Sequence, residues 1–172
     1  MNVTIRLTLN GQSIRETVTP ELSLADYLQE YRDLTGTRVC CGIGVCRACT
    51  VAVKPRDKAL YEATRACITP VASLDGAQIK TTEGLAQGGV LHPLQVAFLK
   101  HFSFQCGYST SGFLMGAYAL LDRLAKNPVS IDEIDNVILE GVGDHICRCT
   151  GYFRYYAAIK DVILTTPDLV KE

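Results

Sequence analysis

Four cysteines in the N-terminal half have a regular spacing. Cys41, Cys46 and Cys49 form a C-x4-C-x2-C pattern, and Cys67 follows further along the chain. This is the plant-type spacing of the four thiolates that hold a [2Fe-2S] cluster. Iron in such clusters favours soft, anionic sulfur, and three ligands from one loop require a tight backbone curl. The two glycines between Cys41 and Cys46 permit the left-handed conformations that this curl needs.

Two other interpretations of these cysteines rank lower. A disulfide framework is typical of small secreted domains, whereas these cysteines lie beside glycines in a chain of 172 residues. A structural zinc site usually uses paired C-x2-C knuckles, and only Cys46 with Cys49 has that form. The spacing therefore favours iron–sulfur binding.

A second set of cysteines lies in the C-terminal half. Cys106 follows Gln105, and Cys147 with Cys149 forms a Cys-Arg-Cys pair just before an expected helix. Thiolates at that position gain from the helix dipole and from free N–H groups. Three cysteines from two turns at one end of a helical bundle are consistent with a second cluster. Buried cysteines are also often only small apolar residues, so this set carries less weight alone.

The residues before the first cysteine loop predict a small sheet. Alternating apolar residues indicate a strand from Val3 to Leu9, and Asn10-Gly11 is a strong hairpin signal. A second strand then ends at Pro20, and later strands are expected over 50–54 and 78–81.

A short helix is expected between the hairpin and the cysteine loop. Ser23, three residues before Asp26, is a capping-box pattern that opens a helix. Its expected buried side carries Leu24, Tyr27, Leu28 and Tyr31. The order of strand, hairpin, strand, helix and metal loop is that of a β-grasp ferredoxin.

The C-terminal half predicts a four-helix bundle. After 83–90 the apolar period changes from two to 3.6, and Pro93 suits the first position of a helix. Short connections between four short helices indicate a compact bundle. The expected helices begin at Pro93 and cover about 112–124, 131–138 and 151–164. We therefore expect a ferredoxin-like domain over 1–82, a linker over 83–90, a bundle over 91–166 and a tail over 167–172.

Composition excludes several classes of function. The formal net charge is −1, without a run of lysine or arginine that would indicate nucleic-acid binding. No apolar run approaches the roughly 18 residues of a membrane span. The N-terminus alternates like a strand and lacks the plan of a signal peptide. Eight cysteines then indicate a reducing compartment, the cytoplasm. Export to the periplasm bound to a signal-bearing partner stays open.

The sequence resembles the small iron–sulfur subunit of the xanthine oxidase family of molybdenum hydroxylases. The resemblance extends from about Val3 to Leu164. The segments that carry it are Leu34-Thr35-Gly36-Thr37, Arg47-Ala48-Cys49-Thr50-Val51, Ala66-Cys67-Ile68-Thr69-Pro70, His92-Pro93-Leu94-Gln95, Phe104-Gln105-Cys106-Gly107-Tyr108 and Cys147-Arg148-Cys149-Thr150-Gly151-Tyr152. It implies an α+β chain, in which an N-terminal β-grasp plant-type ferredoxin domain precedes a C-terminal four-helix-bundle [2Fe-2S] domain.

The resemblance also implies a function, two cofactors and partners. Cys41, Cys46, Cys49 and Cys67 would hold the cluster that faces an FAD-binding or cytochrome acceptor subunit. The cluster of the bundle would lie beside a molybdopterin bound by a separate large subunit, with Gln105 and Cys149 close to the pterin. Electrons from substrate oxidation at molybdenum would leave through this chain. The ligands expected for the cluster of the bundle are Cys106, Ser109, Cys147 and Cys149.

Ser109 is the most informative departure from the family, because the bundle motif of the family is C-x2-C and its second cysteine falls on Ser109. Ser109 ligates iron as an alkoxide, or a water or another group fills the position, or this cluster is absent. The first account is preferred, since the other three ligands and the surrounding glycines are present. Cys40 and Arg47 also stand where the family has glycine. Cys40 is interpreted as a thiol beside the first cluster, with an exchange of ligand from Cys41 to Cys40 as the alternative.

The histidines have simpler interpretations. His92 is expected to cap or pack at the start of a helix, and His101 to lie on the side of the bundle. Histidine ligation of Rieske type exists, but the spacing of His145 does not support it.

Two further functions remain as alternatives. A free-standing carrier ferredoxin would need only the first domain, and a zinc-stabilised interaction module would replace iron with zinc. The carrier ferredoxin leaves the bundle with its Cys-Arg-Cys turn unexplained, and metal analysis would distinguish the zinc module directly.

Overall fold

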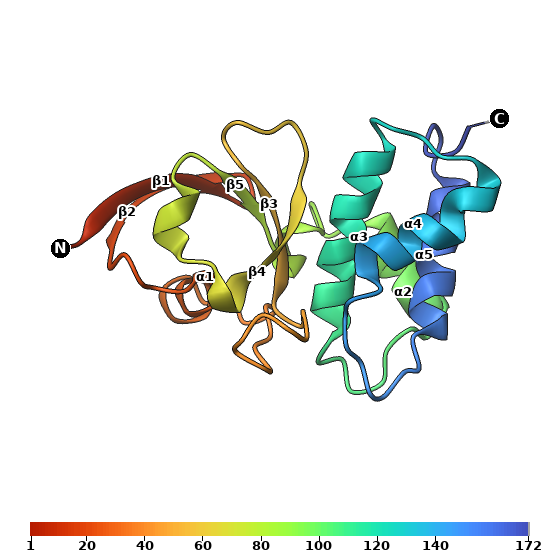
Figure 1. The fold of residues 1–172 in the computed structure, drawn as a ribbon, viewed down its shortest axis with the longest axis horizontal. Helices are drawn as coiled ribbons and strands as arrows, with labels where there is room; N and C mark the ends of the chain where they lie inside the picture. The colour runs from red at the N-terminus through yellow and green to blue at the C-terminus, as the bar shows by residue number, and fades with distance from the viewer. Residues whose placement is uncertain (172) are drawn as a thin grey trace.

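The chain forms a sheet-containing half followed by a helical half, as Figure 1 shows. This computed structural model describes residues 1–171. Each half has its own apolar core, one built on the sheet and one between the helices. The expected α+β fold is thereby confirmed. Among the described residues, no helix is both long enough and apolar enough to cross a bilayer.

The N-terminal half is a five-stranded mixed sheet in the order β2-β1-β5-β3-β4. β1 and β5 run parallel, and the other neighbouring strands are antiparallel. The strands are β1 (Val3–Leu9), β2 (Gln12–Val18), β3 (Thr50–Lys54), β4 (Glu62–Arg65) and β5 (Gln78–Lys80). The predicted strands are confirmed, and β4 is an addition at the edge of the sheet, where the sequence shows no clear alternation.

The hairpin residues Asn10 and Gly11 fix the first two strands and also reach the last. Both have positive φ, 50° and 87°, as the turn preferred between twisted strands requires. The Asn10 side chain donates to Thr81 Oγ1 at 2.9 Å and accepts from the Thr81 N–H at 2.9 Å. The turn therefore anchors the end of β5 beside β1.

The helix before the cysteine loop is shorter than expected. The Ser23 hydroxyl accepts from the Asp26 N–H at 3.0 Å, which confirms the cap. α1 covers only Leu24–Asp26, and a π-helical turn, η1 (Tyr27–Tyr31), follows. The prediction that Tyr31 is buried is wrong, because its side chain is 53% exposed. The wider π turn, with its i→i+5 bonding, turns Tyr31 away from the face that buries Tyr27.

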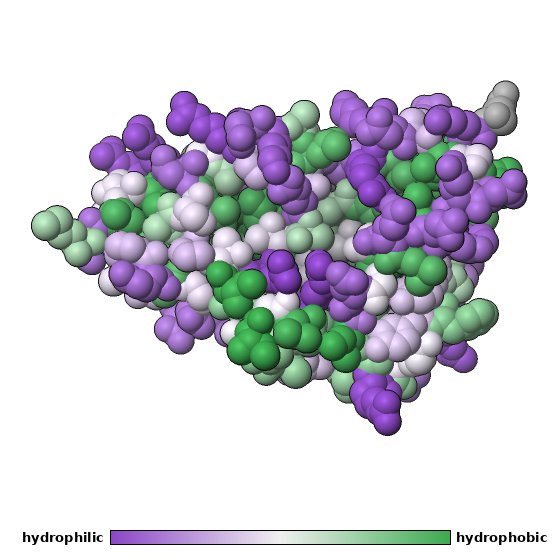
Figure 2. All heavy atoms as spheres, in the orientation of Figure 1, coloured by the Kyte–Doolittle hydropathy of each residue, from purple (hydrophilic) through white to green (hydrophobic). Residues whose placement is uncertain are grey.

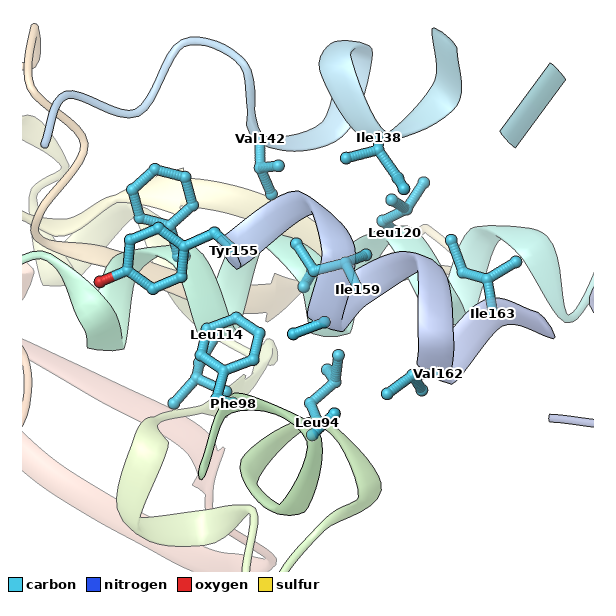
Figure 3. Close-up of a cluster of buried hydrophobic side chains, with 14 of the residues drawn as sticks. Leu94, Phe98, Leu114, Leu120, Ile138, Val142, Tyr155, Ile159, Val162 and Ile163 are labelled. Atoms are coloured by element: carbon cyan, nitrogen blue, oxygen red, sulfur yellow. The ribbon is translucent and has the colours of Figure 1, made fainter. Parts of the chain in front are cut away.

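The C-terminal half is a bundle of four α-helices. They are α2 (Pro93–Lys100), α3 (Thr110–Leu124), α4 (Ile134–Val142) and α5 (Phe153–Thr165). His92 caps α2, since its Nδ1 accepts from the Leu94 N–H at 3.2 Å. Side chains from all four helices meet in the core that Figure 3 shows, among them Phe98, Leu120 and Ile138.

The residues after α5 pack back onto the bundle. Leu169 is buried in its core, and its carbonyl oxygen accepts from the Val129 N–H at 3.3 Å. The last residue of the expected tail, 172, lies outside the described part of the chain.

The two halves meet where α3 packs against β3 and β4. Gly112, in the first turn of α3, lies directly against the loop before β3. A Cβ at this position would overlap the Arg47 carbonyl oxygen and lie 3.0 Å from that of Ala48. Asp122, further along α3, accepts from the Tyr61 N–H at 2.8 Å. The helix is thus held at both ends of its contact with the sheet half.

We expect Gly112→Ala to push α3 away from the sheet half, because the neighbouring atoms are backbone and cannot rotate aside. The free energy of unfolding should fall by about 1–3 kcal/mol, as for other overpacked sites. Denaturant unfolding of the iron-loaded protein measures this. The control is Gly141→Ala in α4, where the new Cβ would meet only the Leu120 side chain at 3.1 Å. Equal losses in the two variants would contradict the close contact.

Candidate metal centres

The first cysteine loop lies between η1 and β3 and curls as the spacing predicts. Gly42 and Gly44 have φ of 68° and 75°, and Arg47 also has positive φ, 58°. Cys46 and Cys49 are buried, whereas Cys41 is partly exposed. Cys67 reaches the same place from η2 (Ala66–Ile68), the short 3-10 turn after β4.

Backbone N–H groups of this loop point at its sulfur atoms. The Val45 and Cys46 N–H groups each donate to Cys41 Sγ at 3.4 Å, and the Cys67 N–H donates to Cys49 Sγ at 3.5 Å. Hydrogen bonds from the Cys46 and Ile43 backbone lower the pKa of the Cys41 thiol to about 6. Such bonds favour the thiolate that a metal requires.

The four thiols form two pairs. The Cys46 N–H donates to Cys41 Sγ, and the Cys67 N–H donates to Cys49 Sγ. Burial raises the pKa of Cys49 to about 11, although the backbone hydrogen bond from Cys67 acts to lower it. A cluster with two irons takes two thiolates on each iron, so this pairing fits a [2Fe-2S] group. Cys40 is exposed beside the loop.

The second site is formed by two turns at one end of the bundle. Cys106 and Cys149 are exposed and their Sγ atoms lie 3.7 Å apart, whereas Cys147 and Ser109 are buried. Gly107 and Gly151 have positive φ, 79° and 63°, which turns the backbone around the site.

Neighbouring side chains change the pKa of the Cys147 thiol. Burial raises its pKa, but hydrogen bonds from the Ser109 and Thr150 side chains outweigh this, so the pKa of Cys147 is lowered. The Cys147 N–H donates to the Tyr152 hydroxyl oxygen at 3.3 Å. The side chain and backbone of this cysteine are therefore both fixed.

Within residues 1–171, no three or more histidine, cysteine, aspartate or glutamate side chains converge closely enough to hold one ion.

Three polar contacts connect the two sites. The Ile146 N–H, next to Cys147, donates to the carbonyl oxygen of Cys46 at 3.0 Å. The Tyr108 hydroxyl, next to Ser109, donates to the Val39 carbonyl at 2.6 Å. The cysteine loop and the two turns of the bundle are therefore joined directly by hydrogen bonds.

The third contact is an ion pair that the sequence did not predict. Arg47 and Asp144 form it at 2.6 Å. They are 97 residues apart in the chain, and no spacing relates them.

His145 lies behind the second site and is not a ligand candidate. It is 2% exposed, its Nδ1 lies 3.1 Å from the Val142 carbonyl, and its ring packs 4.9 Å from that of Phe113. Burial and the nearby Arg47 lower its pKa to about 4, so it is neutral at neutral pH. His101 instead pairs with Asp161 at 2.9 Å on the side of the bundle.

Comparisons with known proteins agree with these two sites. Residues 7–72 match the 2Fe-2S iron-sulfur cluster binding domain family, and residues 81–160 match a second [2Fe-2S] binding domain family. The nicotine 6-hydroxylase small subunit of Paenarthrobacter nicotinovorans is 40% identical over 92% of this chain and 88% of its own length. The chain belongs to the small [2Fe-2S] subunits of molybdenum hydroxylases.

Other relatives show how this subunit is used. The quinoline 2-oxidoreductase of Pseudomonas putida 86 contains a chain that is 35% identical, with a TM-score of 0.78 over 98% of this chain and 93% of that one. Aldehyde oxidase 2 of Rattus norvegicus is 39% identical over 84% of this chain, which spans only 11% of that protein. The same pair of domains thus occurs both as a small chain and as part of a long one.

Arg47 and Asp144 are expected to shift the reduction potentials in opposite directions. Their ion pair lies between the two sites, and a cation favours the more negative, reduced state of a cluster. Arg47→Gln should lower the potentials, and Asp144→Asn should raise them. Redox titration followed by EPR measures both. Arg38→Gln, at an exposed position before the first loop, is the control, and shifts of the same sign in the Arg47 and Asp144 variants would contradict this account.

Proposed function

We propose that this chain relays electrons from a molybdopterin site on a large partner subunit to an FAD-binding or cytochrome acceptor. Its general role, the iron–sulfur electron-transfer subunit of a molybdenum hydroxylase complex, follows from its family. Cys41, Cys46, Cys49 and Cys67 hold one [2Fe-2S] cluster. The other is held by Cys106, Cys147 and Cys149, with Ser109 at the fourth position. The clusters supply one-electron redox chemistry.

The hydrogen bond from Ile146 to Cys46 carries this proposal. It joins the backbone of one ligand, Cys46, to the residue before another, Cys147, at 3.0 Å. A carrier that used a single cluster would need no such connection. The contact supports two clusters that work in series within one rigid chain.

Each site lies beside exposed apolar side chains, and this supports two docking partners. Phe102, Phe104 and Phe153 are exposed in the helical half, in or next to the turns that carry Gln105 and Cys149. We assign this face to the large molybdopterin-binding subunit. Aromatic residues are enriched at the centres of protein interfaces.

The first site has its own apolar rim. Ile43 and Val45 lie in the cysteine loop and Ile68 follows Cys67, and all three are exposed. Figure 2 shows strongly apolar residues gathered beside the junction of the two halves, where this loop lies in Figure 1. We assign this rim to the acceptor subunit. Two apolar faces also weigh against a free-standing carrier ferredoxin, which should expose few such patches.

Purification of the native complex tests the assignment. We expect a large subunit with molybdenum to co-purify with this chain from a cytoplasmic extract. A lone chain without molybdenum would contradict the proposal, and zinc in place of iron would favour the interaction module.

Phe153→Ser should weaken binding of the large subunit by about tenfold or more, because truncated aromatic anchors commonly cost 1–2 kcal/mol or more. Retention of the large subunit on a tagged copy of this chain measures the effect. Ile131→Ser is the control, since Ile131 is also exposed but lies at the start of η5 (Ile131–Glu133), away from the cysteine turns. Equal weakening in both variants would contradict the assigned face.

A further inference from the structure

Ser109 precedes α3 but does not cap it. A serine at this position normally has extended backbone angles, and its oxygen accepts a bond from an N–H of the first turn. Here φ is −86° and ψ is −8°, and the side chain makes no capping hydrogen bond. The side chain is nevertheless buried, 9% exposed. The Ser109 oxygen therefore faces the protein interior without bonding to the first turn of α3.

The neighbours of the Ser109 oxygen are groups of the second metal site. The Ser109 side chain acts on the Cys147 thiol and on the Tyr155 hydroxyl: burial raises the pKa of both groups, and hydrogen bonding from Ser109 opposes this rise in each. Tyr155 is fully buried, and its hydroxyl also lies 2.8 Å from Thr110 Oγ1. Figure 3 shows the Tyr155 ring in the core with its hydroxyl pointing away from the apolar side chains.

The pairing of donor atoms in the two sites indicates that the position of Ser109 requires a metal-binding side chain. In the first site, backbone hydrogen bonds to sulfur pair Cys41 with Cys46 and Cys49 with Cys67. In the second site, Cys106 pairs with Cys149 at 3.7 Å. Cys147 then has Ser109 as its partner, so the serine oxygen occupies the place of a fourth ligand.

We propose that the Ser109 oxygen ligates the buried iron of the second cluster together with Cys147, and that the Tyr155 hydroxyl donates a hydrogen bond to this oxygen. The inference rests on the proposed function, because it assumes a cluster at this site. Ligation replaces the O–H bond of Ser109 with an iron–oxygen bond, and the proton passes to solvent water. No electron is transferred in this step. Tyr155 is a positioning residue, held by its ring stacking on Phe113 at 4.1 Å.

Oxygen ligation makes the two irons of this cluster unequal. Oxygen is a harder donor than thiolate, so it favours ferric iron over ferrous iron. The iron shared by Ser109 and Cys147 is then the more difficult one to reduce. The cluster as a whole has a lower potential than one with four thiolates.

Two substitutions of Ser109 in the native complex test the ligand. Ser109→Cys should keep the cluster, raise its midpoint potential and make its two irons more alike in Mössbauer spectra. Ser109→Ala should reduce iron from about four to about two per chain, while the EPR signal of the first cluster stays. Ser111→Ala is the control, because Ser111 is also buried at the start of α3. If the Ser109→Ala variant keeps both the iron and the midpoint potential of the second cluster, Ser109 is not the ligand.

A spectroscopic test does not depend on how the variants fold. The wild-type complex is transferred into water enriched in oxygen-17 and its reduced state is examined by pulsed ENDOR. A serine ligand does not exchange, so no strongly coupled oxygen-17 should appear at the second cluster. Such a coupling would identify water as the ligand and overturn the proposal.

Tyr155→Phe tests the positioning role. It should lower the potential of the second cluster without loss of iron, since the ligand loses its hydrogen-bond donor, and an unchanged potential would remove Tyr155 from the proposal. Failure of the proposed function would look different, because molybdenum and the large subunit would then be missing whatever residue stands at position 109.

Discussion

The structure depends on the close approach of α3 to the backbone of the first cysteine loop. Gly112 is the position that permits it, because any side chain there would meet the carbonyl oxygens of Arg47 and Ala48. Once the backbones touch, the Ile146 N–H reaches the Cys46 carbonyl, and Arg47 reaches Asp144. A few contacts of modest individual strength thus fix the distance between two redox sites, and a rate of electron transfer depends steeply on that distance.

The two sites bring their donor atoms together with different structural elements. In the first, one irregular loop with positive φ at Gly42, Gly44 and Arg47 supplies three thiols and the N–H groups that polarise them. In the second, two turns at the end of a bundle bring donors together from positions far apart in the chain. On our proposal, the bundle exchanges a thiol for the harder oxygen of Ser109 without rebuilding a loop, and the second site is then the place where a potential is adjusted.

The sequence predicted what is local and repetitive. The spacing of Cys41, Cys46 and Cys49, the Asn10-Gly11 turn and the Ser23 cap each depend on neighbouring residues, and the structure places each of them as expected. The prediction that Tyr31 is buried was wrong because helical periodicity does not reveal a π turn. The contacts of Arg47 with Asp144 and of Ile146 with Cys46 join residues about a hundred positions apart. Such contacts follow from how the halves pack, for which the sequence has no periodic signal.

The proposed function requires that this chain hold two clusters at a fixed, short separation. EPR of the native complex during stepwise reduction reports on this separation, because two nearby unpaired spins split each other's signals. We expect simple signals while only one cluster is reduced, and splitting of both signals once the second is reduced. Gly112→Ala should diminish that splitting. Two signals that add without splitting at full reduction would contradict the account, because the clusters would then be too far apart to act in series.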